Sequence, residues 1–247
     1  MMNSHEDLQS AYDQQALLKD FEKLMTIAER VGSTFLGNEA FDQLAYQTRI
    51  EYKKIIPRLP YVGDEKSQFT NLMIQSGQTI AFYKACKKRG IEKRMIGEMM
   101  YQIAKAQTAS ISRIRKWFAR QLLYTRIYRN RWRRAMEESQ SREYPMNWYG
   151  KFVEGRPNDF AFGFDFLECG FLKLARKFEC KEIVPYACLC DFARLREIGA
   201  GFKRTQTLAM GHTRCDFRFS KSFETPSGWP PESLEEVRHS PFDIVTL

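Results

Sequence analysis

The fold of this chain is decided by a stretch in its second half, Phe160-Ala161-Phe162-Gly163-Phe164-Asp165-Phe166-Leu167. Phenylalanine occupies every second position of this stretch. Because successive side chains of a strand point to opposite faces of a sheet, the spacing predicts a β-strand whose four phenylalanines share one face. An aromatic face of this kind needs a helical layer to cover it, so strands and helices must pack together.

The half of the chain that precedes this strand is helical in pattern. Apolar residues recur at helical spacing and predict helices over 8–31, 38–56, 67–88 and 90–134, the last as one long helix or as two helices with a bend. The segment 57–64 holds two prolines and a glycine, which is typical of a connection.

The residues after the strand alternate between helix and strand patterns. A helix is expected over 168–178, and Pro185 can occupy the first turn of a further helix. Two more strands, 203–209 and 212–219, are predicted to form a hairpin joined at Met210-Gly211. We therefore predict an α+β fold, in which a helical N-terminal half packs on a small antiparallel sheet with flanking helices.

The domain organisation follows from a shift in composition after the helical half. A polar stretch over 137–147, which includes Pro145, is followed by Gly150, Gly155 and Pro157. We expect a helical region over 1–140, an α+β catalytic region with the terminal hairpin over 141–220, and a proline-containing tail over 221–247. A length of 247 residues suits one large domain or two small ones.

The cysteines and the hydropathy bear on the compartment. Six cysteines in a chain of 247 residues are ordinary for a reduced intracellular protein. The first residues are polar and acidic, unlike a secretory signal, and no run of about 18 apolar residues predicts a membrane span. We therefore expect a cytoplasmic protein without disulfides.

The formal net charge of +9 has one local source. Residues 110–134 carry nine positive side chains and no acidic one, so the remainder of the chain is neutral on balance. Aromatic residues are interleaved with these cations, at Trp117, Phe118, Tyr124, Tyr128 and Trp132. An amphipathic helix with a solvated arginine face is the commoner outcome of such a pattern. Nucleic acid or an anionic membrane surface is the alternative partner for the basic helix 113–134.

The predicted hairpin gathers side chains that can carry chemistry. Its pleat places Cys215 on one face of the second strand and His212 and Asp216 on the other. The two-residue turn places Gln206 opposite Cys215 and Thr205 opposite Asp216. A glutamine facing a thiol favours a pocket wall, whereas the alternative is that Cys215 is a small apolar core residue.

The helix that begins near Pro185 contributes a second thiol and a second carboxylate. Cys188 and Asp191 share a helical face with apolar neighbours. Because a buried carboxylate is costly unless it is paired, Asp191 must have a partner or line a cavity. Cys188 is expected in the first turn, where the helix dipole lowers the pKa of a thiol. The alternative is an acid that only stabilises its own helix.

A metal or an organic cofactor is not expected. The six cysteines form no C-x2-C pair, and only three histidines are present. The chain also lacks the glycine-rich phosphate-binding motifs and the nucleophile-elbow motif.

One family resemblance is carried by Arg204-Thr205-Gln206-Thr207-Leu208-Ala209-Met210-Gly211 followed by Cys215-Asp216-Phe217-Arg218-Phe219. This pattern resembles the C-terminal signature of the L-2-amino-thiazoline-4-carboxylic acid hydrolase family. The pair Cys188 and Asp191 lies where that family carries a cysteine and an aspartate. The resemblance covers residues 160–219 and implies hydrolysis of a cyclic, non-peptide carbon–nitrogen system. The reaction that names the family opens an aminothiazoline carboxylate to N-carbamoyl-cysteine.

Together these features predict a hydrolase that opens a cyclic amidine or amide ring of a small molecule. A thiolate would attack the ring carbon, with Cys215 as the first choice and Cys188 as the second. Asp191 or Asp216, with His212, would orient or deprotonate the nucleophile or water. An equally coherent version has no covalent step, and Asp191 activates water while the thiols merely pack.

The substrate is expected to be held by the same segment. Thr205, Thr207 and backbone N–H groups could stabilise the developing charge, and Arg204 or Arg214 could fix a carboxylate. A small-molecule substrate is favoured over nucleic acid as the partner. The competing interpretations are a module that binds a small ligand without reacting, and a protein that binds nucleic acid or a membrane surface through the basic helix.

Overall fold

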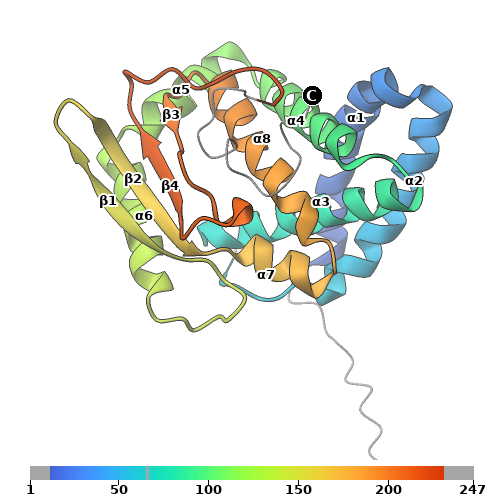
Figure 1. Cartoon of the computed structure of the whole chain (residues 1–247), viewed down its shortest axis with the longest axis horizontal. Helices are drawn as coiled ribbons and strands as arrows, with labels where there is room; N and C mark the ends of the chain where they lie inside the picture. The colour runs from blue at the N-terminus through green and yellow to red at the C-terminus, as the bar shows by residue number, and fades with distance from the viewer. Residues whose placement is uncertain (1–11, 65–66, 231–247) are drawn as a thin grey trace, which may run out of the picture.

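The computed structural model describes residues 12–64 and 67–230 (Figure 1). The first half of the chain is helical, as predicted. Its helices are α1 (Gln14–Leu36), α2 (Asn38–Ile55), α3 (Gln68–Lys88), α4 (Lys93–Ala109), α5 (Arg113–Leu123) and α6 (Arg126–Ser139), with a short 3-10 helix at Ile56–Arg58 after α2.

The segment 90–134 differs from the prediction, because it forms three helices rather than one or two. The reason lies in two hydroxyl side chains that act as N-caps. Ser112 accepts a hydrogen bond from the N–H of Arg115, and Thr125 accepts one from the N–H of Tyr128. Each cap satisfies an N–H group that has no partner within its helix, so each starts a new helix.

The second half forms a four-stranded antiparallel sheet with the order β1-β2-β4-β3. The strands are β1 (Tyr149–Arg156), β2 (Phe160–Glu168), β3 (Phe202–Lys203) and β4 (Cys215–Phe219), and the helices are α7 (Gly170–Lys177) and α8 (Val184–Glu197), with 3-10 helices at Lys181–Ile183 and Leu208–Met210. The predicted α+β class is confirmed. The sheet has four strands among the described residues, whereas three were predicted.

The strand missing from the prediction is β1. Its glycines and the proline that follows it are typical of a loop, but the glycines are sites of close packing. A Cβ added at Gly150 would lie 2.7 Å from the carbonyl oxygen of Asp165 and 2.8 Å from Sδ of Met136. A Cβ at Gly155 would clash with the backbone of Ala161. Glycine is therefore required because β2 and α6 approach β1 closely.

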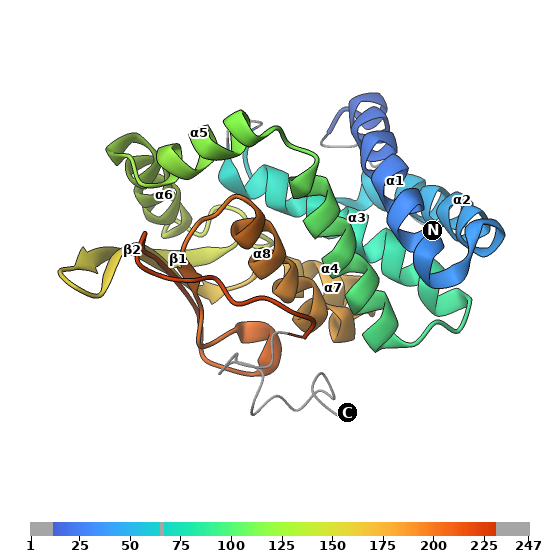
Figure 2. The ribbon, with the colours of Figure 1, turned by 90° about the horizontal axis from the view of Figure 1, so that it is seen from above.

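The aromatic face of β2 lies in the core, as its period-two pattern requires. The ring of Phe164 stacks on Trp132 of α6 at 4.6 Å and on Phe217 of β4 at 4.8 Å. On the far strand, Phe202 packs against Phe192 of α8 at 4.9 Å. Helices α6 and α8 thus cover one face of the sheet, and α8 lies between the sheet and α4 (Figure 2).

The predicted hairpin is correct in register but wrong in extent. Phe202 pairs with Phe219 and Lys203 with Arg218, as the predicted turn would require. The ladder then stops because the carboxylate of Asp216 accepts the N–H groups of Thr205 and Gln206, at 2.8 and 2.7 Å. The chain therefore leaves the sheet as a loop that ends in the 3-10 helix Leu208–Met210.

The predicted tail begins after β4. Its described part, 221–230, packs on the body, because the hydroxyl of Thr225 accepts the N–H of Phe202 at 3.0 Å and Trp229 lies 5.3 Å from the ring of Tyr101. Residues 231–247 lie outside the described residues. The division into regions at 140 and 220 stays a prediction.

Candidate functional site

Helix α8, strand β4 and the loop 204–207 bring two thiols to one hydroxyl. Oγ1 of Thr207 lies 3.3 Å from Sγ of Cys215 and 3.9 Å from Sγ of Cys188. The backbone N–H of Leu208 donates to Sγ of Cys215 at 3.2 Å. Two hydrogen-bonding groups thus converge on the Cys215 sulfur, which is the arrangement that can hold a negative charge there.

The loop 204–207 is tied to α8 by a buried guanidinium. Nη1 of Arg204 lies 2.8 Å from Oδ2 of Asp191, and Nη2 donates to the carbonyl oxygen of Cys188 at 2.9 Å. The side chain of Arg204 is 1% exposed, and that of Asp191 is 34% exposed. Asp191 therefore has the partner that its place on an apolar helix face requires. The same contact engages the guanidinium of Arg204, which the sequence had suggested for binding a substrate carboxylate.

Asp216 fixes the other side of this loop. Besides the two backbone N–H groups, its carboxylate accepts the hydroxyl of Thr205 at 2.6 Å. The buried carboxylate thus accepts three hydrogen bonds, as charged side chains do when they cap and stabilise a turn. This geometry suits a group that positions the loop beside Cys215.

His212 closes the loop from its C-terminal end. Its ring Nδ1 accepts the backbone N–H of Thr207 at 3.3 Å, and the backbone N–H of His212 donates to the carbonyl oxygen of Thr207 at 3.3 Å. His212 is half-exposed, and its ring meets the backbone of Thr207, whereas the hydroxyl of Thr207 faces the two sulfurs. Thr207 thus has direct contacts with both thiols and with His212.

Arg214 is not brought to this cluster. Its Nε lies 3.7 Å from Oδ2 of Asp165, and Arg218 contacts the other oxygen of that carboxylate at 2.7 Å. Asp165 alternates along β2 with Phe164 and Phe166, and Phe166 is the partner of Cys215. Asp165 and its two arginines therefore lie on the face of the sheet opposite Cys215.

A model of one protein family, described as L-2-amino-thiazoline-4-carboxylic acid hydrolase, matches residues 71–219, more than half of the chain. The chain belongs to this family. The resemblance seen in the sequence is confirmed, and the matched segment extends back into α3. No curated protein and no solved structure matches the chain.

The segment that matches the hydrolase family contains a third thiol near this cluster, Cys169, which no sequence pattern marks as a site residue. Cys169 follows β2, and a charge on its sulfur would interact with charges on both Cys188 and Cys215. No local pattern marks this residue, because only the pairing of β2 with β4 and the packing of α8 bring it close. Among the described residues, no group of three or more potential ligands is arranged to hold a metal ion.

The thiol of Cys188 does not have the low pKa that was predicted from its helix. Burial raises the pKa of Cys188 well above its ordinary range, and the nearby Arg204 guanidinium only partly opposes this. The residue lies more than one turn into α8, which begins at Val184, so the helix dipole acts on it weakly. Burial likewise raises the pKa of Cys169 to about 12. Both thiols therefore keep their protons at neutral pH.

These buried thiols predict how stability depends on pH. A folded thiol with a raised pKa keeps a proton that the unfolded chain loses above about pH 8.5. The free energy of unfolding should therefore fall as the pH rises past that value, up to the folded pKa of Cys169. In the variant Cys169→Ala, the fall should be less steep by up to about 1.4 kcal/mol per pH unit. Urea unfolding between about pH 8 and pH 10 measures both slopes. Equal slopes would contradict the burial of a protonated thiol.

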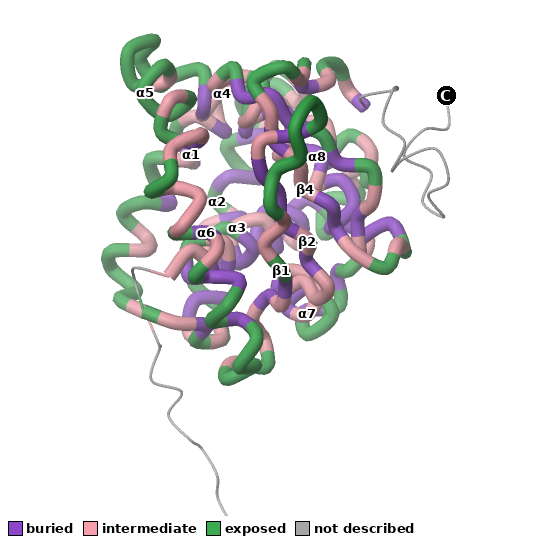
Figure 3. The backbone as a smooth tube through the Cα atoms, turned by 90° about the vertical axis from the view of Figure 1, so that its left-hand side faces the viewer, coloured by how far each residue is buried: buried purple, intermediate pink, exposed green. Residues whose placement is uncertain are grey.

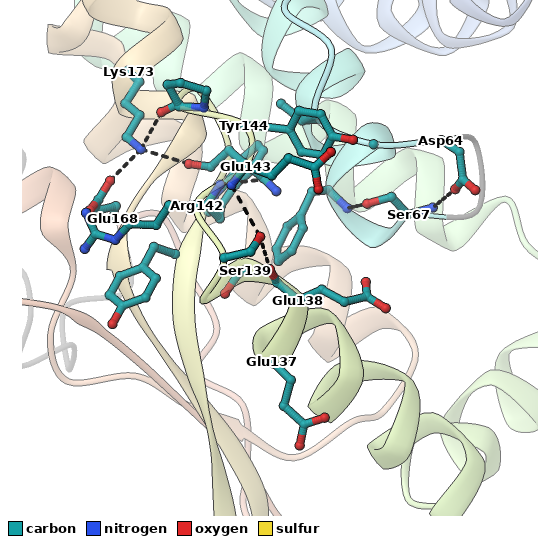
Figure 4. Close-up of a pocket in the computed structure, with 18 residues that line it drawn as sticks. Asp64, Ser67, Glu137, Glu138, Ser139, Arg142, Glu143, Tyr144, Glu168 and Lys173 are labelled. Atoms are coloured by element: carbon teal, nitrogen blue, oxygen red, sulfur yellow. Dashed lines mark hydrogen bonds and ion pairs between the residues drawn. The ribbon is translucent and has the colours of Figure 1, made fainter.

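A separate cavity of about 870 Å³ is lined mainly by the end of α6 and the segment 141–149 (Figure 4). Its lining includes Arg142, Glu168, Lys173 and Trp148. The indole of Trp148 slightly lowers the pKa of Cys169, so this side chain lies beside that sulfur as well as in the wall of the cavity. Cys188, Asp191, Cys215 and Asp216 do not line this cavity.

One observation bears on association with membranes. Among the helices that the structure describes, none has both the length and the apolar character needed to cross a bilayer.

Proposed function

We propose that this member of the hydrolase family opens a cyclic amidine or amide-type ring of a small molecule, with Cys215 as the nucleophile. The observation that carries the proposal is the environment of its sulfur, which receives the N–H of Leu208 at 3.2 Å and faces the hydroxyl of Thr207 at 3.3 Å. Donors fixed by the backbone can stabilise a thiolate without reorganising.

The proposed reaction has two steps. The Cys215 thiolate adds to the electrophilic ring carbon, and the bond from that carbon to a ring heteroatom breaks as the heteroatom takes up a proton. Water then attacks the same carbon, and the thiol leaves. The sum is one molecule of water added to one ring, which gives an open-chain product.

Thr207 and His212 are the groups proposed to move the proton. The hydroxyl of Thr207 is in contact with the Cys215 sulfur, and the imidazole of His212 contacts the backbone of Thr207 from the half-exposed side. In this proposal the hydroxyl of Thr207 takes up the proton that Cys215 must lose, and the half-exposed His212 beside the same residue is its final acceptor.

A second mechanism is favoured by the exposure of Asp191. Its carboxylate is one-third exposed although it is paired with Arg204, so one oxygen can face water. In this version Asp191 activates a water molecule, which attacks the ring carbon directly, and the thiols pack without reacting. A module that binds a small ligand without turnover is the remaining alternative.

The experiment that tests the proposal is incubation of the purified chain with 2-amino-thiazoline-4-carboxylate and with related cyclic amides and amidines. Mass spectrometry in isotopically labelled water should detect a product that has gained one water. Recovery of every compound unchanged, together with heat released on binding one of them, would identify a binding module and contradict the proposal.

A further inference from the structure

Helix α5 presents an apolar side to solvent. Ile114, Trp117, Phe118 and Leu122 are between 51% and 70% exposed. At 3.6 residues per turn these positions fall on one side of the helix. Figure 3 shows that α5 is exposed along most of its length at the edge of the molecule.

The opposite side of α5 faces the body. Leu123 is buried there, and Nζ of Lys116 lies 3.7 Å from Oε2 of Glu197 at the end of α8. The apolar side of α5 therefore points outward, together with the arginines that were expected to be solvated. Two residues that flank α5 in the sequence, Ile111 and Ile127, are exposed as well. We call Ile114, Trp117, Phe118 and Leu122 the α5 patch.

Cations border the α5 patch. By helical spacing, Arg115 lies along one margin of the patch and Arg113 and Arg120 along the other, and all three residues are exposed. No acidic residue occurs between 110 and 134. An exposed apolar face of this size, with arginines on its margins, is the pattern of a helix that lies in the interface of an anionic bilayer.

We propose that the α5 patch inserts into the headgroup region of a membrane that contains anionic phospholipids. Trp117 and Phe118 would lie among the headgroups and upper acyl chains, where aromatic rings are favoured, and the arginines would contact lipid phosphates. This surface attachment requires no spanning helix. It is independent of the reaction proposed for Cys215.

Two other occupants fit the same surface less well. Nucleic acid could stack on Trp117 and Phe118, but stacking leaves the aliphatic side chains of Ile114 and Leu122 uncovered. A second copy of the chain would bring two strongly basic surfaces together without any acidic residue from 110–134, which opposes a symmetric dimer. A bilayer covers both the apolar and the cationic parts.

Flotation of the full chain with lipid vesicles tests this proposal. The chain should bind vesicles of phosphatidylcholine mixed with phosphatidylglycerol much more strongly than vesicles of phosphatidylcholine alone, and added salt should weaken binding. The emission of Trp117 should shift to the blue on binding, and this shift should be absent in the variant Trp117→Phe.

Paired variants separate the α5 patch from general surface properties. The double variant Trp117→Ser and Phe118→Ser should bind at least about tenfold more weakly, whereas Tyr46→Ser, which removes an exposed ring on α2, should not change binding. Replacing Arg113, Arg115 and Arg120 together by glutamine should weaken binding about a hundredfold. The matched control replaces Lys19, Arg30 and Lys53, which are exposed on α1 and α2, by glutamine and should leave vesicle binding nearly unchanged. Circular dichroism checks that each variant is folded.

Several outcomes would overturn the proposal. One is no vesicle binding at low salt, and another is binding that the α5 variants and their controls affect equally. Another outcome is a dimer in sedimentation that the Trp117→Ser and Phe118→Ser variant no longer forms, together with no binding to vesicles. That result would assign the α5 patch to a second copy of the chain. Salt-dependent binding of RNA or DNA without vesicle binding would assign it to nucleic acid.

Discussion

Replacement of Cys215 by alanine is expected to lower turnover of a cyclic substrate by about a thousandfold or more, because the reaction would lose its nucleophile. Folding should persist, since alanine fits the space of a cysteine and the loop is still held by Asp216. The measurement is kcat/KM by mass spectrometry, with urea unfolding as a check on folding. The control is Cys86→Ala, a buried cysteine on α3 that should leave activity unchanged.

The same assay separates the two mechanisms when Cys188→Ala is included. If Cys215 alone is the nucleophile, Cys188→Ala should keep most of the activity, because its protonated thiol only borders Thr207. Full activity in both cysteine variants would exclude the thiol route. Loss of activity in Asp191→Asn alone would then favour direct attack by water.

Removal of the Asp191 carboxylate is expected to lower the free energy of unfolding by about 3 kcal/mol. The variant Asp191→Ala removes the carboxylate that pairs with the guanidinium of Arg204, whose side chain is only 1% exposed, and breaking a buried ion pair is costly. Urea unfolding at neutral pH measures the change.

The matched control for Asp191→Ala is a salt bridge at the surface. Glu154 on β1 lies 2.6 Å from Arg133 of α6, but its side chain is 69% exposed. Glu154→Ala should therefore cost less than about 1 kcal/mol. Similar losses in the two variants would show that burial of Arg204 does not govern the energy of its pair. A double-mutant cycle with Arg204→Met would then measure the coupling directly.

Elements with a strong local period were predictable from the sequence. The alternating phenylalanines of β2 and the apolar spacing of α1, α2 and α3 are properties of short windows, because a strand repeats every two residues and a helix every 3.6. Strand β1 was missed for the opposite reason. Gly150 and Gly155 resemble loop residues locally, but they are required where the backbone of β2 approaches.

The candidate site was predicted in part. Cys188, Asp191, Cys215 and Asp216 were selected from the sequence, and the structure places all four around the loop 204–207. The low pKa expected for Cys188 was wrong, because a helix position can be read from sequence whereas burial of a sulfur depends on what packs over it. The exposed side of α5 could not be predicted either, since the same amphipathic pattern arises whichever side faces the body.

The sequence by itself determined the α+β class, the aromatic strand and the family, because these depend on residue order over short distances or on a matched segment. Only the tertiary structure decided which polar groups meet. The pairing of Arg204 with Asp191, the addition of Cys169 to the thiol cluster and the placement of Arg214 on the opposite face all depend on contacts between distant segments. The physical reason is that period and propensity act along the chain, whereas burial, charge pairing and the pKa of a thiol depend on neighbours that only folding brings together.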